Sequence, residues 1–202
     1  MIDVKKSITP ASQAGTGLNR TLVLVGLMGA GKTSVGKRLA SLLDVPFVDS
    51  DTEIVQAASM TIPEIFEMYG EQGFRDGERR VIARLLADRP GILATGGGAF
   101  IEMDTRKEIK ARATSVWLRA SVDLLWDRVR GRHGRPLLDA PDPKAVLAGL
   151  ERARASVYAQ ADVIVDSRRG ASHEVMAREI VEAVRARDRK QNDGHPTLAL
   201  LP

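Results

Sequence analysis

The 202-residue sequence predicts an α/β fold, in which helices cover both faces of a parallel β-sheet. Short apolar runs alternate along the chain with segments whose apolar residues recur at helical spacing, which is typical of such folds. A glycine-rich loop follows the first apolar run, and an amphipathic segment follows that loop. The hydrophobic fraction of 44% is sufficient for a sizeable core, which Val, Leu, Ile and Ala must dominate because aromatic residues make up only 4%.

Five strands are expected, each short and apolar, because strands of a parallel sheet are covered on both faces. Their expected ranges are Thr21–Val25, Val45–Val48, Gly91–Ala94, Ser115–Leu118 and Asp162–Val165.

Helices are expected between these strands. The first follows the glycine-rich loop and places the apolar residues between Val35 and Leu43 on one face. The second begins at Thr61, where Glu64 completes a Thr-x-x-Glu capping box, and ends at Gly70. Its apolar face is expected to consist of Ile62, Ile65, Phe66 and Tyr69. Further helices are expected at Phe74–Ala87, Thr105–Ala113, Ser121–Val129, Pro143–Tyr158 and Ser172–Arg187.

A single domain is expected over residues 21–188, because the chain has the length of one domain and shows no internal repeat. Residues 1–20 and 189–202 are expected to be a disordered leader and tail. The leader has no apolar stretch that could form the core of a signal peptide, and a transit peptide is the alternative interpretation. Residues 131–143 contain two glycines and three prolines, and we expect them to form a long, mobile and functional loop.

The composition argues against several classes of protein. No apolar run approaches the roughly 18 residues of a membrane span, and the absence of cysteine excludes disulfides and thiolate metal sites. The net charge of +4 comes from 30 basic and 26 acidic residues that are mostly interleaved. No basic stripe with interleaved aromatic residues indicates a binder of single-stranded nucleic acid. We therefore expect a cytoplasmic protein, with no nucleic-acid or membrane partner, whose excess of arginine serves phosphorylated ligands.

The strongest motif is a phosphate-binding loop. Residues 26–33 read G-L-M-G-A-G-K-T and match the pattern G-x-x-x-x-G-K-[ST], between an apolar strand and an amphipathic helix. Backbone N–H groups of such a loop turn toward phosphate oxygens, and the helix N-terminus adds partial positive charge. Lys32 can reach the β- and γ-phosphates of ATP, and the Thr33 hydroxyl can ligate Mg²⁺. The residues expected to bind the nucleotide here are Gly29, Ala30, Gly31, Lys32, Thr33 and Ser34.

An acidic pair, Asp49 and Asp51, closes the second expected strand. Because ligands gather at the carboxyl ends of parallel strands, both carboxylates are expected near Lys32. One of them could hold Mg²⁺, and the other could orient a substrate hydroxyl and accept its proton. A solvated turn is the alternative, since Asp and Ser are common in turns.

From Thr21 to Arg187 the chain resembles the shikimate kinases, with motifs in the order of that family. The phosphate-binding loop is similar to theirs, and the segment D-S-D-T-E-I at 49–54 resembles their D-x-D-x-x-I. The segment 62–78 resembles their substrate helix with its F-R-x-x-E motif, and residues 96–98 match their triple glycine. Residues 135–138 match the lid motif R-P-L-L, and Arg154 with Tyr158 matches R-x-x-x-Y.

The resemblance implies a three-layer P-loop kinase fold with a five-stranded parallel sheet, a substrate-binding helical segment and a lid loop. It implies that Asp51 binds the substrate hydroxyls and acts as base, and that Asp49 supports Mg²⁺ together with Thr33. The implied carboxylate site consists of Arg75 and Arg154 beside the backbone of Gly96, Gly97 and Gly98. Arg135 would close from the lid onto the phosphates, and Arg128 would lie over the adenine. The implied catalytic residues are therefore Asp51, Lys32 and Arg135.

The implied reaction is phosphorylation of the 3-hydroxyl of shikimate by ATP with Mg²⁺, and we expect the enzyme to be a monomer. Another small-molecule kinase of the same fold, such as a gluconate kinase, is one alternative. A module that senses a ligand without turnover is the other. The combination of F-R-x-x-E with R-P-L-L argues against the first alternative, and the retention of Lys32, Asp51 and Arg135 argues against the second.

Overall fold

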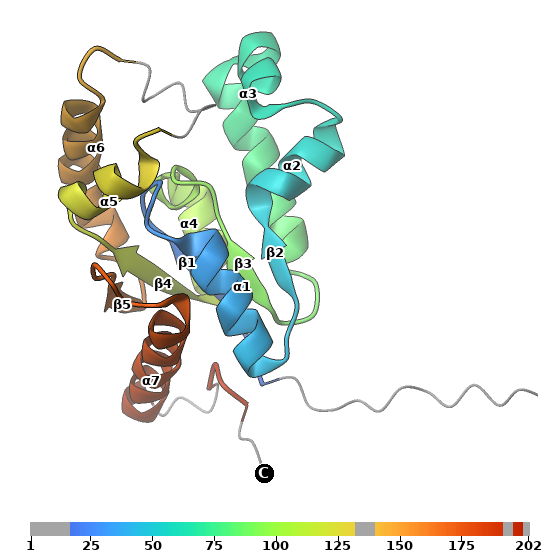
Figure 1. Ribbon diagram of the computed structural model, residues 1–202. Helices are drawn as coiled ribbons and strands as arrows, with labels where there is room; N and C mark the ends of the chain where they lie inside the picture. Colours follow the sequence, from blue (N-terminus) through green and yellow to red (C-terminus); the bar gives the residue numbers. More distant parts are fainter. Residues whose placement is uncertain (1–16, 132–139, 192–195, 200–202) are drawn as a thin grey trace, which may run out of the picture.

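The computed structural model describes residues 17–131, 140–191 and 196–199. Within them, five parallel strands form one sheet in the order β2-β3-β1-β4-β5 (Figure 1). The strands are β1 (Thr21–Val25), β2 (Phe47–Asp49), β3 (Ile92–Ala94), β4 (Ala113–Arg119) and β5 (Val163–Asp166). The expected α/β fold is confirmed, and each strand overlaps the range that the sequence predicts.

Helices lie on both faces of this sheet. Helices α1 and α7 pack against each other on one face, and α4 lies on the other, where it contacts β4 and α3 (Figure 1). Helices α2 and α3 lie toward the β2 edge, whereas α5 and α6 lie toward the β5 edge. The bounds are α1 (Lys32–Leu43), α2 (Ser50–Ala58), α3 (Ile62–Leu85), the 3₁₀-helix η1 (Ala99–Ile101), α4 (Met103–Arg112), α5 (Val122–Val129), α6 (Pro143–Tyr158) and α7 (His173–Gln191).

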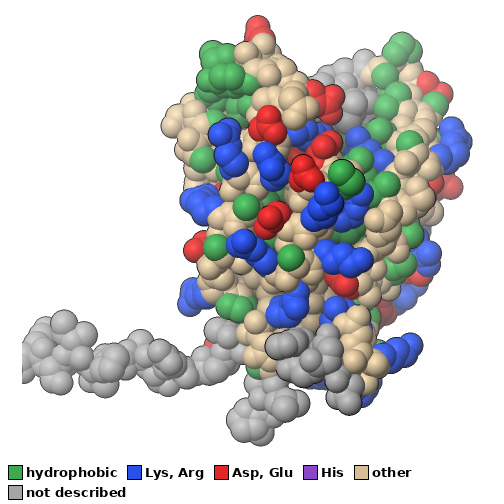
Figure 2. Space-filling view, turned by 180° about the vertical axis from the view of Figure 1, so that it is seen from behind, with side chains coloured by type: hydrophobic (Ala, Val, Ile, Leu, Met, Phe, Trp, Pro, Cys, Tyr) green, Lys and Arg blue, Asp and Glu red, His purple; other side chains and the backbone are tan. Residues whose placement is uncertain are grey.

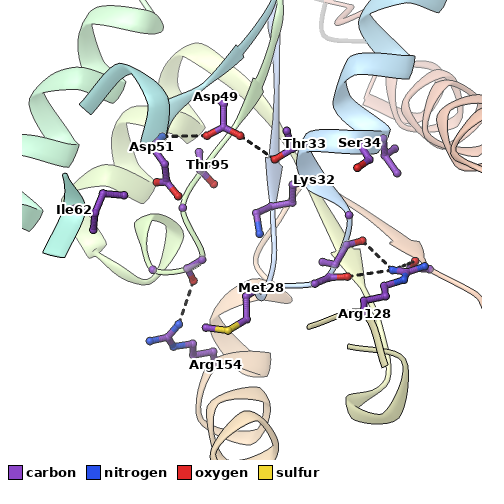
Figure 3. A pocket seen from close by; sticks show the side chains of 18 of the residues that line it. Met28, Lys32, Thr33, Ser34, Asp49, Asp51, Ile62, Thr95, Arg128 and Arg154 are labelled. Carbon is purple, nitrogen blue, oxygen red and sulfur yellow. Dashed lines mark hydrogen bonds between the residues drawn. The ribbon is translucent and has the colours of Figure 1, made fainter. Parts of the chain in front are cut away.

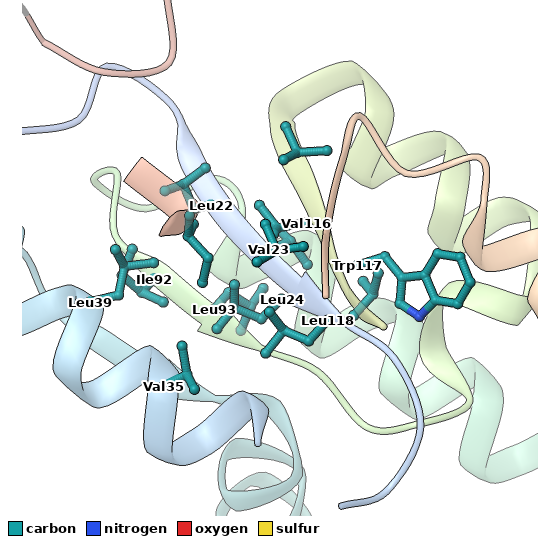
Figure 4. Close-up of a cluster of buried hydrophobic side chains, with 14 of the residues drawn as sticks. Leu22, Val23, Leu24, Val35, Leu39, Ile92, Leu93, Val116, Trp117 and Leu118 are labelled. Carbon is teal, nitrogen blue, oxygen red and sulfur yellow. The ribbon is translucent and has the colours of Figure 1, made fainter. Parts of the chain in front are cut away.

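The core is centred on β1, every residue of which is buried. Leu22, Val23 and Leu24 are fully enclosed by side chains of β3, β4 and α1 (Figure 4). Each buried aliphatic side chain contributes on the order of 1.5–3 kcal/mol to stability. The strand that leads into the phosphate-binding loop is therefore firmly packed at the centre of the sheet.

Helix α3 consists of two helical segments that meet at Gly70, where the sequence analysis expected a helix to end. Its first turn is as predicted, because Thr61 and Glu64 form the expected capping box. Gly70 has the non-helical values φ 68° and ψ −178°, so the helix breaks there in a kink and the second segment continues directly to Leu85. The apolar face of its first part is only partly as predicted, since Ile65 is buried whereas Tyr69 is 59% exposed.

Helix α2 is an element that the sequence analysis missed. It begins directly after β2, where the Asp49 side chain accepts a hydrogen bond from the Asp51 backbone N–H at 3.1 Å. Among its apolar side chains only Ile54 is buried, so the sequence of this helix has no repeat of apolar residues at helical spacing that would predict it. The helix matters for function because it fixes the direction in which Asp51 points.

Residues 17–20 and 196–199, which flank the expected folded unit of residues 21–188, pack against each other or against α7. Leu18 and Leu198 form an isolated antiparallel bridge, and both side chains are buried. The Asp188 carboxylate accepts hydrogen bonds from the backbone N–H groups of Thr197 and Leu198, at 2.8 and 3.1 Å. Residues 17–20 and 196–199 therefore belong to the packed structure, whereas residues 1–16 lie outside the described residues.

Candidate active site

A cavity of about 580 Å³ opens at the carboxyl ends of the strands, which is where open parallel sheets bind ligands (Figure 3). Its walls come from the β1–α1 loop with the start of α1, the end of β2 with the start of α2, α3, the loop after β3, α5, α6, and the β5–α7 connection with the start of α7. Every expected site residue that the structure describes lines this one cavity. Arg135, with the rest of the expected lid motif, lies outside the described residues.

The phosphate-binding loop has the backbone that its glycines allow. Gly29 and Gly31 have φ values of 80° and 98°, a left-handed region that residues with a side chain rarely occupy. Helix α1 starts immediately after Gly31, so its N-terminal N–H groups face the cavity. The Lys32 ammonium group donates to the carbonyl oxygens of Gly26 and Leu27, at 2.7 and 3.0 Å. The Lys32 side chain is therefore folded back onto the phosphate-binding loop and places its positive charge there.

Two oxygen ligands lie side by side at the start of α1 and the end of β2. The Thr33 hydroxyl donates to Asp49 Oδ2 at 2.8 Å, while Asp49 Oδ1 caps α2 (Figure 3). A hydroxyl and a carboxylate are the kind of oxygen donors that Mg²⁺ prefers. The pair therefore fits a magnesium ion whose remaining ligands are water and phosphate oxygens.

The loop after β3 passes between its neighbours with no room for side chains. A Cβ atom on Gly96 would lie 2.7 Å from Asp51 Oδ1 and 3.0 Å from Glu78 Oε1. A Cβ atom on Gly98 would lie 2.5 Å from the Arg75 guanidinium. The glycine turn, as we call residues 96–98, thus brings its bare backbone against two carboxylates and one arginine.

Hydroxyl groups and an arginine fix this glycine turn from both sides. The backbone N–H of Gly96 donates to Ser50 Oγ at 3.2 Å, and the Ser50 side chain is fully buried. The carbonyl oxygen of Gly97 accepts a hydrogen bond from Arg154 Nη1 at 3.2 Å and another from the Tyr158 hydroxyl. The turn therefore joins the start of α2 to α6 within the wall of the cavity.

Arg75 is held by a glutamate to which the sequence analysis assigned no role. Glu78 lies one helical turn later on α3, is 1% exposed, and accepts a bond from Arg75 Nη1 at 2.6 Å. Burial raises the pKa of Glu78 despite the opposing effect of the Arg75 charge, and Asp51 raises it further. Although burial alone would lower the pKa of Arg75, the charge of Glu78 raises it. The signal in the sequence was the final position of the F-R-x-x-E motif.

Arg128 braces the phosphate-binding loop. Its Nη1 donates to the carbonyl oxygens of Gly29 and Ala30 at 3.2 and 3.3 Å and to Ser167 Oγ at 3.0 Å. Burial lowers the pKa of this guanidinium. The position of Arg128 on the cavity wall is compatible with the expected role over the adenine, and its contacts link α5 to the loop.

The β5–α7 connection and the first turn of α7 supply further cavity residues that sequence reasoning missed. These are Ser167 and Ala171 in the connection, and His173 and Met176 in α7. They carry no motif of their own, and only the fold brings them to the cavity, where Ser167 contacts Arg128. Met28, Ile62, Phe66 and Phe74 add apolar surface to the same cavity.

Comparison with known proteins agrees with this geometry. A sequence model described as shikimate kinase matches residues 28–185. A shikimate kinase of Bradyrhizobium diazoefficiens is 52% identical over 167 residues, which is 83% of this chain and 80% of the relative. One of Paramagnetospirillum magneticum is 55% identical over 150 residues, or 74% of this chain and 77% of the relative.

Solved structures divide into close and distant neighbours. A shikimate kinase from Acinetobacter baumannii, solved in complex with shikimate, superposes with a TM-score of 0.79 and 38% identity, covering 83% of this chain and 93% of that one. A gluconokinase from Sinorhizobium meliloti reaches a TM-score of 0.55 with 18% identity, covering 87% and 98% of the two chains. The second likeness shows the fold alone.

We predict that Glu78→Gln weakens the hold on Arg75 and raises KM for an anionic substrate at this site about fivefold. The substitution keeps the shape and an acceptor oxygen but replaces a charge-assisted bond by a neutral one, which costs about 1 kcal/mol. Because the pKa of Glu78 is raised above 4.5, the native enzyme should lose this charge as the pH falls through the raised value. The KM of the native enzyme should therefore rise as the pH is lowered. In a plot of KM against pH, this rise should be smaller for the Glu78→Gln variant.

Glu71→Gln is the matched control, because Glu71 also faces Arg75, at 3.5 Å, but is 74% exposed. Its KM should stay within about twofold of the native value, as expected for an exposed ion pair.

The two variants are also expected to differ in how their free energy of unfolding depends on pH. Since the pKa of Glu78 is raised on folding, this group favours the folded state at low pH and loses that contribution as the pH rises. Equal KM values for both variants would contradict the role of Glu78.

Proposed function

Because this chain belongs to the shikimate kinase family, we propose that it transfers the γ-phosphate of ATP to the 3-hydroxyl of shikimate, giving shikimate 3-phosphate and ADP. One observation in the structure of this chain supports the proposal independently of the family. A single cavity joins the phosphate-binding loop to Arg75 and Arg154, and Asp51 lines that cavity too. An anionic acceptor held by the arginines would therefore present a hydroxyl to the terminal phosphate of ATP.

The nucleotide half of the reaction rests on the β1–α1 loop. Backbone N–H groups and the start of α1 would hold the phosphate oxygens, and Lys32 would turn from its loop carbonyls to the β- and γ-phosphates. Thr33 and Asp49 would hold Mg²⁺, which when bound neutralises charge on the transferred group. Arg135 would add positive charge from the lid, and this remains a prediction from the sequence.

The acceptor half rests on α3, α6 and the glycine turn. Arg75 and Arg154 present planar guanidinium forks, which suit a carboxylate better than lysine does. Glu78 orients Arg75, and the backbone of Gly96–Gly98 allows the substrate ring to approach closely. Held in this way, the substrate carboxylate would fix the distance between the ring hydroxyls and Asp51.

Asp51 is the proposed general base. It stands at the start of α2, where the cap formed by Asp49 sets its backbone, and its Oδ1 lies against Gly96. From there the carboxylate can accept a hydrogen bond from the acceptor hydroxyl and take its proton as the phosphoryl group is transferred. Most of the rate enhancement would come from alignment and charge neutralisation, since phosphoryl transfer requires little covalent chemistry of the protein.

Other interpretations receive less support. A gluconate kinase shares the fold at 18% identity, but a family match covers residues 28–185 for shikimate kinase. On the face that Figure 2 shows, Lys and Arg side chains are interspersed with Asp and Glu, so this face offers nucleic acid no uniform basic surface. Within the described ranges, none of the helices has the length and apolar character needed to cross a membrane. A monomeric state and a cytoplasmic location remain predictions from the sequence.

We predict that Asp51→Asn lowers kcat by about 10²–10⁴-fold, the usual effect of removing a general base, with little change in KM for ATP. The measurement is ADP release with shikimate and ATP varied in turn. Asp88→Asn, at an exposed turn position outside the cavity, is the matched control and should behave as the native chain. A fall in kcat smaller than about tenfold would limit Asp51 to an orienting role.

The experiment that tests the function itself uses Arg75→Ala and Arg154→Ala. Each arginine is expected to contribute charge-assisted bonds worth roughly 1.5–3 kcal/mol to the carboxylate, so either loss should raise KM for shikimate about ten- to a hundredfold. KM for ATP should change little. The double variant should lose less than the product of the two factors, because both residues serve one group.

Arg79→Ala, which removes a half-exposed arginine of the same helix, is the control and should leave both KM values within about twofold. A larger rise in KM for ATP than for shikimate would assign Arg75 and Arg154 to phosphate instead. If the native chain releases no more ADP with shikimate than without it, the proposed function is wrong.

A further inference from the structure

Tyr158 reaches the active site from behind the cavity wall. It is the last residue of α6, is 1% exposed, and stacks on Trp117 with ring centroids 5.7 Å apart. It does not line the cavity, yet its hydroxyl donates a hydrogen bond to the carbonyl oxygen of Gly97, which does. A buried aromatic ring thus carries one polar group, aimed at the backbone of the glycine turn.

The same carbonyl oxygen has a second donor, Arg154 Nη1 at 3.2 Å (Figure 3). A carbonyl oxygen has two lone pairs and can accept both bonds. The two donors differ in whether they also bind the substrate. Arg154 is partly buried, lines the cavity and is the proposed ligand of the substrate carboxylate, whereas the Tyr158 ring is packed against other aromatic rings.

We propose that the Tyr158 hydroxyl is a positioning group that holds the Gly97 carbonyl in place when Arg154 turns from it to the carboxylate of the substrate. The inference rests on the proposed function, because it requires an anionic substrate at Arg154. Without the hydroxyl, the turn of Arg154 would leave a partly buried carbonyl oxygen with no donor, and that penalty would oppose substrate binding.

Two features suit Tyr158 to this role. Burial raises the pKa of the Tyr158 hydroxyl, so the group keeps its proton and remains a donor throughout the neutral and mildly alkaline range. The ring is also held by packing, since it stacks on Trp117 on one side and lies 6.5 Å from the ring of Phe100. Little conformational freedom is therefore lost when the hydroxyl becomes the sole donor to Gly97.

Tyr158→Phe tests the proposal, because it removes the hydroxyl and keeps the ring. KM for shikimate should rise about five- to thirtyfold, the usual effect of leaving one buried acceptor unsatisfied, while KM for ATP should stay within about twofold. The sequence contains two tyrosines, and the other provides the control. Tyr69→Phe makes the same chemical change at a residue that is 59% exposed, and both KM values should be unchanged.

A double-variant comparison separates positioning from general stabilisation. In the Arg154→Ala background Gly97 has already lost its second donor and the substrate has lost its ligand, so Tyr158→Phe should change KM for shikimate by less than about twofold. The proposal is overturned if the two effects multiply, if KM for ATP rises as much as KM for shikimate, or if Tyr158→Phe lowers the melting temperature without changing either KM.

A spectroscopic measurement covers the case in which Tyr158→Phe does not fold. In Tyr69→Phe protein labelled with 3-fluorotyrosine, the one fluorine resonance reports on Tyr158. Saturating shikimate should shift that resonance, and the shift should be absent in the Arg154→Ala variant. An unshifted resonance, or an equal shift without Arg154, would overturn the inference. Native activity is measured in parallel, so a chain that phosphorylates shikimate but shows no such shift refutes this inference and leaves the proposed function intact.

Discussion

The glycine turn lies against the phosphate-binding loop, α2 and α3. Cβ atoms on Gly96 and Gly98 would lie only 2.7 Å from Asp51 Oδ1 and 2.5 Å from the Arg75 guanidinium, whereas one on Gly97 would be in ordinary contact with Met28, 3.6 Å from its backbone nitrogen. This close approach sets the separation between the nucleotide half and the acceptor half of the cavity. The other contacts of the site, from Ser50 on one side and from α6 on the other, hold the turn in that position.

The charges of the site form two groups that meet near this turn. Lys32 and Arg128 lie over the phosphate-binding loop, while Arg75 and Arg154 face the acceptor side. Among the carboxylates, Glu78 is the most enclosed, and its raised pKa reflects the cost of burying a charge beside Asp51. In return, Glu78 holds the Arg75 guanidinium ready for an anion, so the Arg75 side chain does not have to be ordered when the substrate binds.

The sequence analysis was most successful where one motif determines local geometry. The loop around Lys32 and the carboxylates of Asp49 and Asp51 lie together as expected, because a parallel sheet brings the ends of its strands to one edge. Helix α2 was missed because only Ile54 among its apolar residues is buried. Ser167 was missed for a different reason, because its partner Arg128 lies 39 positions away and no local pattern encodes that contact. Tyr158 was noted as the last position of R-x-x-x-Y but was given no role, because its bond to the Gly97 carbonyl, 61 positions away, appears only in the fold.

The measurement that tests the account most directly is ADP release at saturating ATP and Mg²⁺ with shikimate, quinate, gluconate or no acceptor. Because the arginines fix the carboxylate and thereby the hydroxyl that reaches Asp51, an acid of different shape should misplace that hydroxyl, which costs about a hundredfold. The account predicts that kcat/KM for shikimate exceeds that for gluconate and quinate by about this factor or more. Equal or faster turnover of gluconate, or ADP release that does not depend on any acid, would contradict it.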